Sequence, residues 1–347
     1  MIKKINITIN EIFKDLNDIN KINKKRKAGI AQKLRRETLK YMVKNKTIDD
    51  LNINTNIKLF NELLNIKVNN LYDFFKLKIN NYFDPITNNI SISSRKNIQL
   101  NLIAKDFINL YTKNNYSNFI LNIHGSQADG ETTNYSDIDI SLFIKVCAFE
   151  NTEKTNQTFL EIDSINRLMN YWDKSSHHSA FINLETDFKC YPEAFMPISV
   201  LKLGIMPKNN LIQIQSTRDG LDLLFENYFN ILKIIITIIN QKKYFNTIVL
   251  KQLLSSYFML LILEFQIKER EYLDKKSIFK KINKNNNHFD LLNILSKIRE
   301  KWPTNNFSPN VGISDSLILK IMKQIERMTN NIQSPNLLKE IKLKYFL

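Results

Sequence analysis

The spacing of apolar residues divides the chain into a helical start, a mixed middle and a helical end. Up to residue 83, apolar positions recur at mixed three- and four-residue intervals, which predicts helices. Residues 84–97, DPITNNISISSRKN, have the proline, asparagine and serine content of a linker. After Gly204 the pattern predicts two long amphipathic helices, over 221–239 and 248–265, packed as a helical hairpin.

The middle of the chain switches between helical and strand periodicity. Helical spacing of apolar residues alternates with short apolar or alternating runs, a pattern typical of an α/β unit. The elements expected are a helix over 98–111, a buried strand over 119–124, a strand over 138–144, a helix over 159–172 and a strand over 180–191. In the last of these, Glu185 and Asp187 fall on the polar face.

The net charge of +16 comes from 50 basic and 34 acidic residues. About ten of the surplus charges fall in residues 1–46, which hold KKRKAGIAQKLRRETLK. This segment predicts a helix with a basic face, which is either solvated or in contact with phosphates. Lysine is frequent along the whole chain, so the charge alone does not require a nucleic-acid partner.

Cysteine content and apolar segments indicate the compartment. Cys147 and Cys190 are too few for a disulfide framework and lie in apolar surroundings, so we expect buried free thiols. The first residues lack the apolar core of a signal peptide. The most apolar segments, ILKIIITII and YFMLLILEF, are short and bounded by charge. A soluble, cytoplasmic protein without a membrane partner is expected.

Residues 124–143, HGSQADGETTNYSDIDISLF, place two aspartates one residue apart at the start of a strand. Asp137 and Asp139 therefore share a face, roughly 6–7 Å apart along the backbone. At an effective dielectric near 20, the two charges repel by about 3 kcal/mol. A divalent cation is the simplest compensation, and hard carboxylate oxygens suit Mg²⁺.

The glycine end of the same stretch has the character of a phosphate site. A strand ending at His124 and turning at Gly125-Ser126 leaves backbone N–H groups available at the start of the next element. Gly125 permits close backbone approach, and the Ser126 hydroxyl adds a donor. One end of the stretch is thus suited to phosphate and the other to the metal that bridges it.

An apolar residue before Gly-Ser, followed about ten residues later by Ser-Asp-apolar-Asp-apolar, resembles the signature of the DNA polymerase β-like nucleotidyltransferase superfamily. That superfamily includes small bacterial nucleotidyltransferases and kanamycin-type antibiotic nucleotidyltransferases. The resemblance covers about residues 98–204. It implies an α+β fold with a nucleotidyltransferase-type small mixed sheet and flanking helices over 98–215. A basic helical region with its linker would occupy 1–97, and a C-terminal helical bundle 216–347.

The resemblance also implies a site. An NTP would contact Gly125 and Ser126, and two Mg²⁺ ions would be held by Asp137, Asp139 and a third acid from the next core strand. Asp187 is preferred as that acid for its distance to Pro192, and Glu185 is its rival. One departure concerns Gln127-Ala128-Asp129-Gly130, where many relatives carry Arg before the second glycine. A basic residue that would assist with phosphate is missing there.

Three further candidates are weaker. The segment YLDKKSIFKK (272–281) resembles a lysine-containing segment in the helical region of some relatives, where Lys276 would reach the triphosphate as a point charge. A solvated turn is the alternative. His124 either touches the nucleotide or only ends a strand. His177-His178 is expected to be an exposed loop pair rather than a metal site, because no acid or cysteine lies at matching spacing.

The function expected is Mg²⁺-dependent transfer of an NMP from an NTP such as ATP to a hydroxyl group, with release of pyrophosphate. A small molecule or a protein is the favoured acceptor. Template-independent addition to RNA ends is the alternative enzyme, supported by the basic segment 24–46. A module that binds NTP without turning it over is the non-enzymatic alternative.

Overall fold

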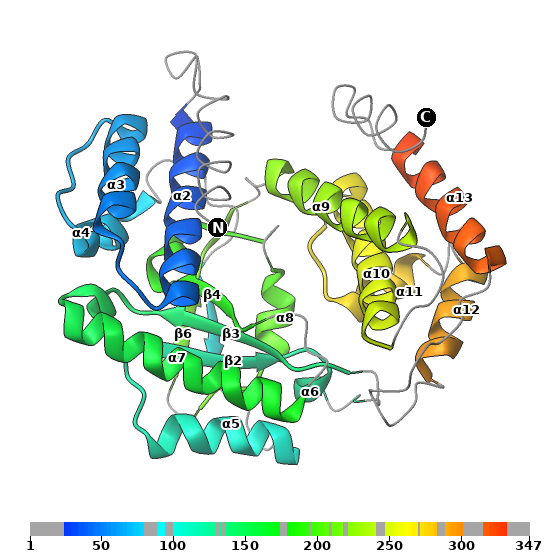
Figure 1. Ribbon diagram of the computed structural model, residues 1–347, viewed down its shortest axis with the longest axis horizontal. Helices are drawn as coiled ribbons and strands as arrows, with labels where there is room; N and C mark the ends of the chain where they lie inside the picture. The colour runs from blue at the N-terminus through cyan, green and yellow to red at the C-terminus, as the bar shows by residue number, and fades with distance from the viewer. Residues whose placement is uncertain are drawn as a thin grey trace.

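A small mixed sheet flanked by helices, with a separate group of helices at the C-terminal end, makes up the computed structural model of this α+β chain (Figure 1). The structure describes residues 24–79, 89–93, 100–129, 132, 136–173, 179–193, 196–207, 210–217, 221–240, 247–269, 271–282, 289–300 and 315–331.

The described helices and strands follow the predicted order closely. The α-helices are α2 (Lys24–Asn45), α3 (Asp50–Leu64), α4 (Leu71–Lys76), α5 (Leu102–Lys113), α6 (Ser126–Asp129), α7 (Thr152–Trp172), α8 (Ile198–Leu203), α9 (Leu221–Asn240), α10 (Thr247–Glu269), α11 (Lys275–Ile282), α12 (Phe289–Glu300) and α13 (Asp315–Asn331). The 3₁₀ helices are η3 (Val146–Phe149) and η4 (Glu185–Cys190). The strands are β1 (Ile90–Ser93), β2 (Phe119–His124), β3 (Asp139–Ile144), β4 (Phe181–Leu184), β5 (Tyr191–Pro192), β6 (Leu211–Ile214) and β7 (Ser216–Thr217).

The central sheet has the order β2-β3-β4. β2 and β3 are antiparallel, and His124 lies directly opposite Asp139. β3 and β4 are parallel, so that Ser141 pairs with Phe181 and Ile144 with Leu184. Because side chains alternate along a strand, this register places His124, Asp139 and Ser141 on one face of the sheet.

Two hydrophobic clusters cover the two faces of this sheet. One face packs with α2–α5 and α7 into a continuous core that extends from Ala28 to Ile205. The other carries Ile120 and Phe143 and packs against α8, β1 and β6. The N-terminal helices therefore share a core with the sheet, although the sequence suggests a separate region ending in a linker.

The C-terminal helices form a third cluster, which begins at Leu224 and ends at Met328. α9 and α10 pack against each other as the expected hairpin, and α11–α13 complete the group (Figure 1). A buried ion pair connects this group to the sheet unit, because Lys251 Nζ of α10 lies 3.3 Å from Asp173 Oδ2 at the end of α7.

Two segments differ from the sequence interpretation. Ile90–Ser93, within the expected linker, is strand β1 and pairs with β6. The expected strand 180–191 ends at Leu184, and the chain continues as η4 and then the short strand β5, which holds Pro192. The tight winding of η4 removes the alternation that put Glu185 and Asp187 on one polar face.

Asparagine and aspartate side chains explain where several helices begin. Each accepts a hydrogen bond from a backbone N–H of the first turn, which satisfies a donor that the helix itself leaves unpaired. These capping residues are Asp49, Asn70, Asn101, Asn151 and Asp274. The high asparagine content of the chain is thus partly structural.

One helix in the part of the chain that the structure describes is long and apolar enough to cross a membrane. It covers Ile248–Glu269 in α10, and 61% of its most apolar window is buried by the rest of the protein. This apolar stretch is longer than the segment YFMLLILEF that the sequence indicated. Its burial against α9 is consistent with the core helix of a soluble protein. Both cysteines are free thiols; Cys190 is buried, and Cys147 is half-buried.

Candidate functional site

Gly125 ends β2 in a conformation and a space that only glycine accepts. Its φ is +69°, in the left-handed region. A Cβ added there would lie 2.4 Å from Oδ2 of Asp139, well inside contact distance. The Asp139 carboxylate is therefore packed directly against the backbone of the Gly-Ser turn. This contact links the two ends of the 124–143 stretch and is the reason for a glycine at this position.

Substitution of Gly125 by alanine is expected to destabilise the fold by about 1–3 kcal/mol, because the new Cβ displaces Asp139 and the backbone is strained. Gly29→Ala is the matched control. Gly29 lies inside α2, where an added Cβ would have no atom within 4 Å, so alanine should be neutral or stabilising by up to about 1 kcal/mol. Urea unfolding of both variants measures the difference, and equal stabilities would contradict this account of the turn.

The turn is held in place by its neighbours. Ser126 begins the short helix α6, and Ala128 N–H donates to Gly125 O at 3.0 Å. The amide of Asn101, which caps α5, donates to Gln127 Oε1 at 2.9 Å and to Gln127 O at 3.2 Å. These bonds attach α6 to α5 at the end of the sheet nearest the C-terminal helices (Figure 1).

Asp137 and Asp139 lie on the same side of the chain at this end of the sheet. Ile138 between them is buried at 1% exposure, whereas both aspartates are half-buried. Ile138 packs into the same core as Ile140, and the Asp139 carboxylate on the other side of the strand lies against the Gly125–Ser126 turn.

Lys275, the first residue of α11, faces these carboxylates from the C-terminal helices. Its ammonium interacts electrostatically with Asp137 and with Asp139, and both raise its pKa. Burial by the surrounding protein and repulsion from Arg299 act more strongly in the opposite direction and lower the pKa of Lys275 to about 8. The side chain keeps access to solvent. At neutral pH it remains mostly protonated and presents a positive charge to the aspartates.

Aromatic rings position the two cations. Lys275 Nζ lies 5.1 Å from the ring centre of Phe258 and 5.7 Å from that of Phe279. The guanidinium of Arg299 lies 4.7 Å from the ring centre of Phe258. Ring faces attract cations at these distances. Two positive groups are thus held close together opposite two negative ones.

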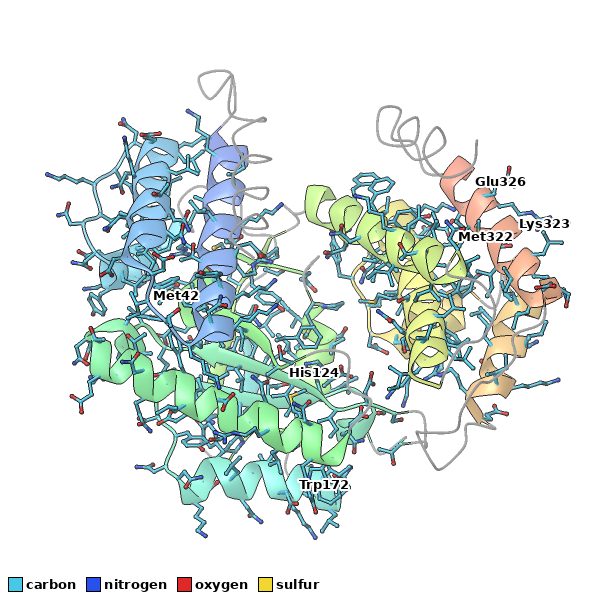
Figure 2. The ribbon with its side chains drawn as sticks, in the orientation of Figure 1. Met42, His124, Trp172, Met322, Lys323 and Glu326 are labelled. Carbon is cyan, nitrogen blue, oxygen red and sulfur yellow. The ribbon has the colours of Figure 1, made fainter. Side chains whose placement is uncertain are left out.

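His124 belongs to the buried part of the same sheet face. Its exposed fraction is 4%, and its Nε2 lies 3.0 Å from Ser141 Oγ. Its ring lies 5.8 Å from that of Phe181. Figure 2 shows His124 at the end of the sheet nearest the C-terminal helices. Its position opposite Asp139 makes it a neighbour of the site rather than a simple strand end.

The expected third acid does not lie at this site. Because β3 and β4 are parallel, Asp139 begins β3 at one end of the sheet while Glu185 and Asp187 follow β4 at the other end. Five residues of strand, about 16 Å, separate Asp139 from the Ile144–Leu184 pair. Glu185 Oε1 there accepts a hydrogen bond from Val146 N at 2.8 Å. Neither acid meets Asp137 and Asp139.

Asp187 instead forms a buried ion pair with Arg35 of α2. Arg35 Nη2 lies 2.6 Å from Asp187 Oδ1, and Arg35 is fully buried. The guanidinium also donates to the carbonyl of Leu77 at 2.6 Å and to that of Phe75 at 3.3 Å. Asp187 therefore attaches the N-terminal helices to the sheet. The expectation that it lies beside Asp137 and Asp139 as the third acid was wrong.

Lys275, the residue before the predicted Lys276, interacts electrostatically with the carboxylates. Asp274 caps α11 through Ser277 N at 3.1 Å, so the helix begins at Lys275. Helical spacing then places Lys275 on the same side as Ile278 and Phe279, and both lysines are exposed to solvent. The Asp-x-x-Ser spacing in the sequence was the signal that could have located this helix start.

The remaining candidates from the sequence are the basic segment 24–46 and the His177-His178 pair. In the basic segment 24–46, Arg35 and Arg36 point inward and are buried, so the basic face is narrower than predicted. His177-His178 lies outside the described residues. Within the described part of the chain, no group of three or more histidine, cysteine, aspartate or glutamate side chains is arranged to hold a metal ion.

Comparison of the chain with protein-family models, with curated proteins and with solved structures finds no match. A functional assignment therefore rests on the geometry of the site.

Proposed function

We propose that the chain binds an NTP with Mg²⁺ at Gly125, Ser126, Asp137 and Asp139, and transfers its NMP to an acceptor hydroxyl. The contact between Gly125 and the Asp139 carboxylate carries the proposal, because it joins a phosphate-type turn to a metal-type carboxylate pair. Lys275 adds a cation on the opposite side. A triphosphate with its metal matches this arrangement of charges.

The residues present fit a hard divalent cation. Two carboxylates on one side repel each other, and their oxygens are the ligands that Mg²⁺ prefers. Gly125 leaves no side chain between the turn and Asp139. Bound Mg²⁺ supplies neutralisation of phosphate charge during the transfer. The Gly125–Ser126 turn and Lys275 would hold the phosphates so that the reaction is in line.

In the proposed reaction the acceptor oxygen forms a bond to the α-phosphorus, and the bond from that phosphorus to the bridging oxygen of the β-phosphate breaks. Pyrophosphate leaves, and the proton of the acceptor hydroxyl passes to solvent. Positioning and charge stabilisation account for most catalysis of this type, so the chain needs no covalent intermediate.

A second function is favoured by the position of Asp187. Because that acid pairs with Arg35 at the far end of the sheet, two carboxylates rather than three face the turn among the described residues. A site with two carboxylates suffices to bind an NTP with its metal. The second candidate is therefore an NTP-binding module that does not turn the nucleotide over.

The deciding experiment measures binding and pyrophosphate release together. Purified protein is incubated with each labelled NTP, Mg²⁺ and fractionated cell extract, and pyrophosphate is measured with and without a chelator. Chelator-sensitive release with label in an extract fraction supports transfer and identifies the acceptor. Binding without release supports the module, and absence of Mg²⁺-dependent NTP binding rejects both.

A further inference from the structure

The C-terminal helices and the sheet do not share a hydrophobic core in the part of the chain that the structure describes. The core residues of the C-terminal helices all fall between Leu224 and Met328. The two clusters on the faces of the sheet contain only residues from Ala28 to Ile214. Groups without a large apolar interface are expected to move relative to each other. A different kind of contact is therefore needed to fix the C-terminal helices against the sheet.

The buried ion pair between Asp173 and Lys251 is such a contact. The two side chains are 6% and 3% exposed, and Lys251 Nζ lies 3.3 Å from Asp173 Oδ2. Asp173 ends α7, where its N–H donates to the carbonyl of Met169 at 2.8 Å, and Met169 belongs to the core of the sheet. Lys251 follows Leu250, which belongs to the core of the C-terminal helices. Each charge is therefore attached to a helix that is packed firmly within its own group.

The side of α10 that carries Lys251 also carries an aromatic ring that positions the lysine of the proposed site. Phe258 follows Lys251 by seven residues, which is two turns and about 10 Å along the same side of the helix. The ring centre of Phe258 lies 5.1 Å from Lys275 Nζ. A displacement of α10 at Lys251 therefore also moves Lys275 relative to the aspartates of the proposed site.

We propose that the Asp173–Lys251 pair fixes the position of the C-terminal helices against the sheet and so holds Lys275 opposite the carboxylates of the proposed site. The consequence for NTP binding rests on the proposed function, whereas the position of the helices does not. Apolar contacts tolerate sliding, but sliding at this pair separates two buried opposite charges, which is costly. A buried ion pair thus selects one arrangement even where it adds little to stability. Asp173 and Lys251 are positioning residues in this sense.

The test measures the distance between the two groups in solution. Spin labels are attached to the substitutions Asn156→Cys on α7 and Lys323→Cys on α13, both at exposed positions of the full-length protein. The native thiols are removed by Cys147→Ser and Cys190→Ala. Pulsed electron paramagnetic resonance of this labelled protein should give one narrow distance distribution.

The variant Lys251→Met/Asp173→Leu removes both charges of the pair. Its free energy of unfolding should equal or exceed that of the labelled protein, because apolar side chains of similar size replace a buried ion pair without loss. Its distance distribution should nevertheless broaden or shift. If the fraction of molecules with the original distance falls to about one tenth, the apparent dissociation constant for NTP should rise about tenfold.

The matched control is Arg35→Met/Asp187→Leu, which removes a buried ion pair whose two partners both belong to the sheet unit. This variant should retain the narrow distribution. Lys251→Arg keeps the charge on α10 and should retain it as well. Urea unfolding confirms that each variant is folded. Should Lys251→Met/Asp173→Leu fail to fold, Asp173→Asn, which keeps the size of the side chain, takes its place.

A broadened or shifted distribution in the Lys251 and Asp173 variant, with the control unchanged, supports the inference. An unchanged distribution in that variant overturns it, as does an equal change in the control. Broadening with unchanged NTP affinity confirms that the pair positions the helices and removes Lys275 from NTP binding. If the wild-type protein binds no NTP, the proposed function fails, and the distance measurement still decides whether the pair positions the helices.

Discussion

Replacement of Asp187 by asparagine is expected to lower the free energy of unfolding by about 3–5 kcal/mol, because it leaves the buried Arg35 guanidinium without its counter-charge. Arg35 is fully enclosed, and besides Asp187 it donates to neutral carbonyl groups, including that of Leu77. An unpaired charge in such a place retains the full cost of desolvation. Denaturant unfolding measures the loss.

Asp163→Asn provides the comparison for this effect. Asp163 also pairs with cations, Lys46 at 2.7 Å and Arg167 at 2.9 Å, but those partners lie at the surface. These pairs lower the pKa of the Asp163 carboxyl, so its contribution to stability is present at neutral pH and is lost as pH falls through the folded-state pKa. Its replacement should cost about 1 kcal/mol or less.

The double substitution Arg35→Met/Asp187→Leu sharpens the test. Removing both charges eliminates the unpaired guanidinium, so this variant should recover much of the stability lost in Asp187→Asn. If Asp187→Asn instead leaves stability unchanged and abolishes pyrophosphate release, Asp187 belongs to the catalytic group and the interpretation of the Arg35 pair as structural is wrong.

Local sequence patterns predicted most of the elements because their signals are short in range. The apolar run before Gly125, the alternation from Ile138 and the helical spacing after Gly204 each depend on neighbours in the chain. The structure has a strand or a helix at each of these places. These signals predicted an α/β unit, and the small mixed sheet with flanking helices that the resemblance implied is confirmed as the coarse fold. The finer nucleotidyltransferase-type fold stays a prediction.

The position of the third acid could not be predicted because it depends on strand direction. Whether β4 runs parallel or antiparallel to β3 decides which end of it lies beside Asp139, and periodicity is the same in both cases. The partner of Asp187 is equally remote, since Arg35 is 152 residues away in sequence. By contrast, Gly125 and Asp139 lie at the ends of adjacent strands within one short stretch, so the local sequence pattern was enough to predict that they belong to one site.

The position of Lys275 near the carboxylates could not be predicted from the sequence, because it depends on how the C-terminal helices are placed relative to the sheet. The sequence resemblance pointed to Lys276, whereas Lys275, the first residue of α11, interacts with the carboxylates. The orientation of Lys275 depends on the packing of α11 through the buried Ile278 and through Phe279, which contacts the C-terminal core. The long-range Asp173–Lys251 pair, which connects α7 to α10, was not visible in the sequence for the same reason.

Asp139→Asn is expected to reduce Mg²⁺-dependent pyrophosphate release by about a thousandfold or more while leaving the fold intact. The loss of several kcal/mol of charge stabilisation in the transition state corresponds to that factor. Asparagine keeps the shape of the side chain against Gly125, so the turn is preserved. Asp106→Asn, at a half-buried position in the middle of α5, removes the same charge outside the proposed site and should leave release unchanged.

The free energy of unfolding provides a second test of the Asp139→Asn variant. Neutralising Asp139 removes its repulsion with Asp137, which is up to about 3 kcal/mol, and also removes its attraction to Lys275. The two effects oppose each other, so the free energy of unfolding should change little. Denaturant unfolding and pyrophosphate release are measured on the same preparations. If Asp139→Asn destabilises the protein and keeps its activity, the carboxylate pair is structural and the proposed enzyme is rejected.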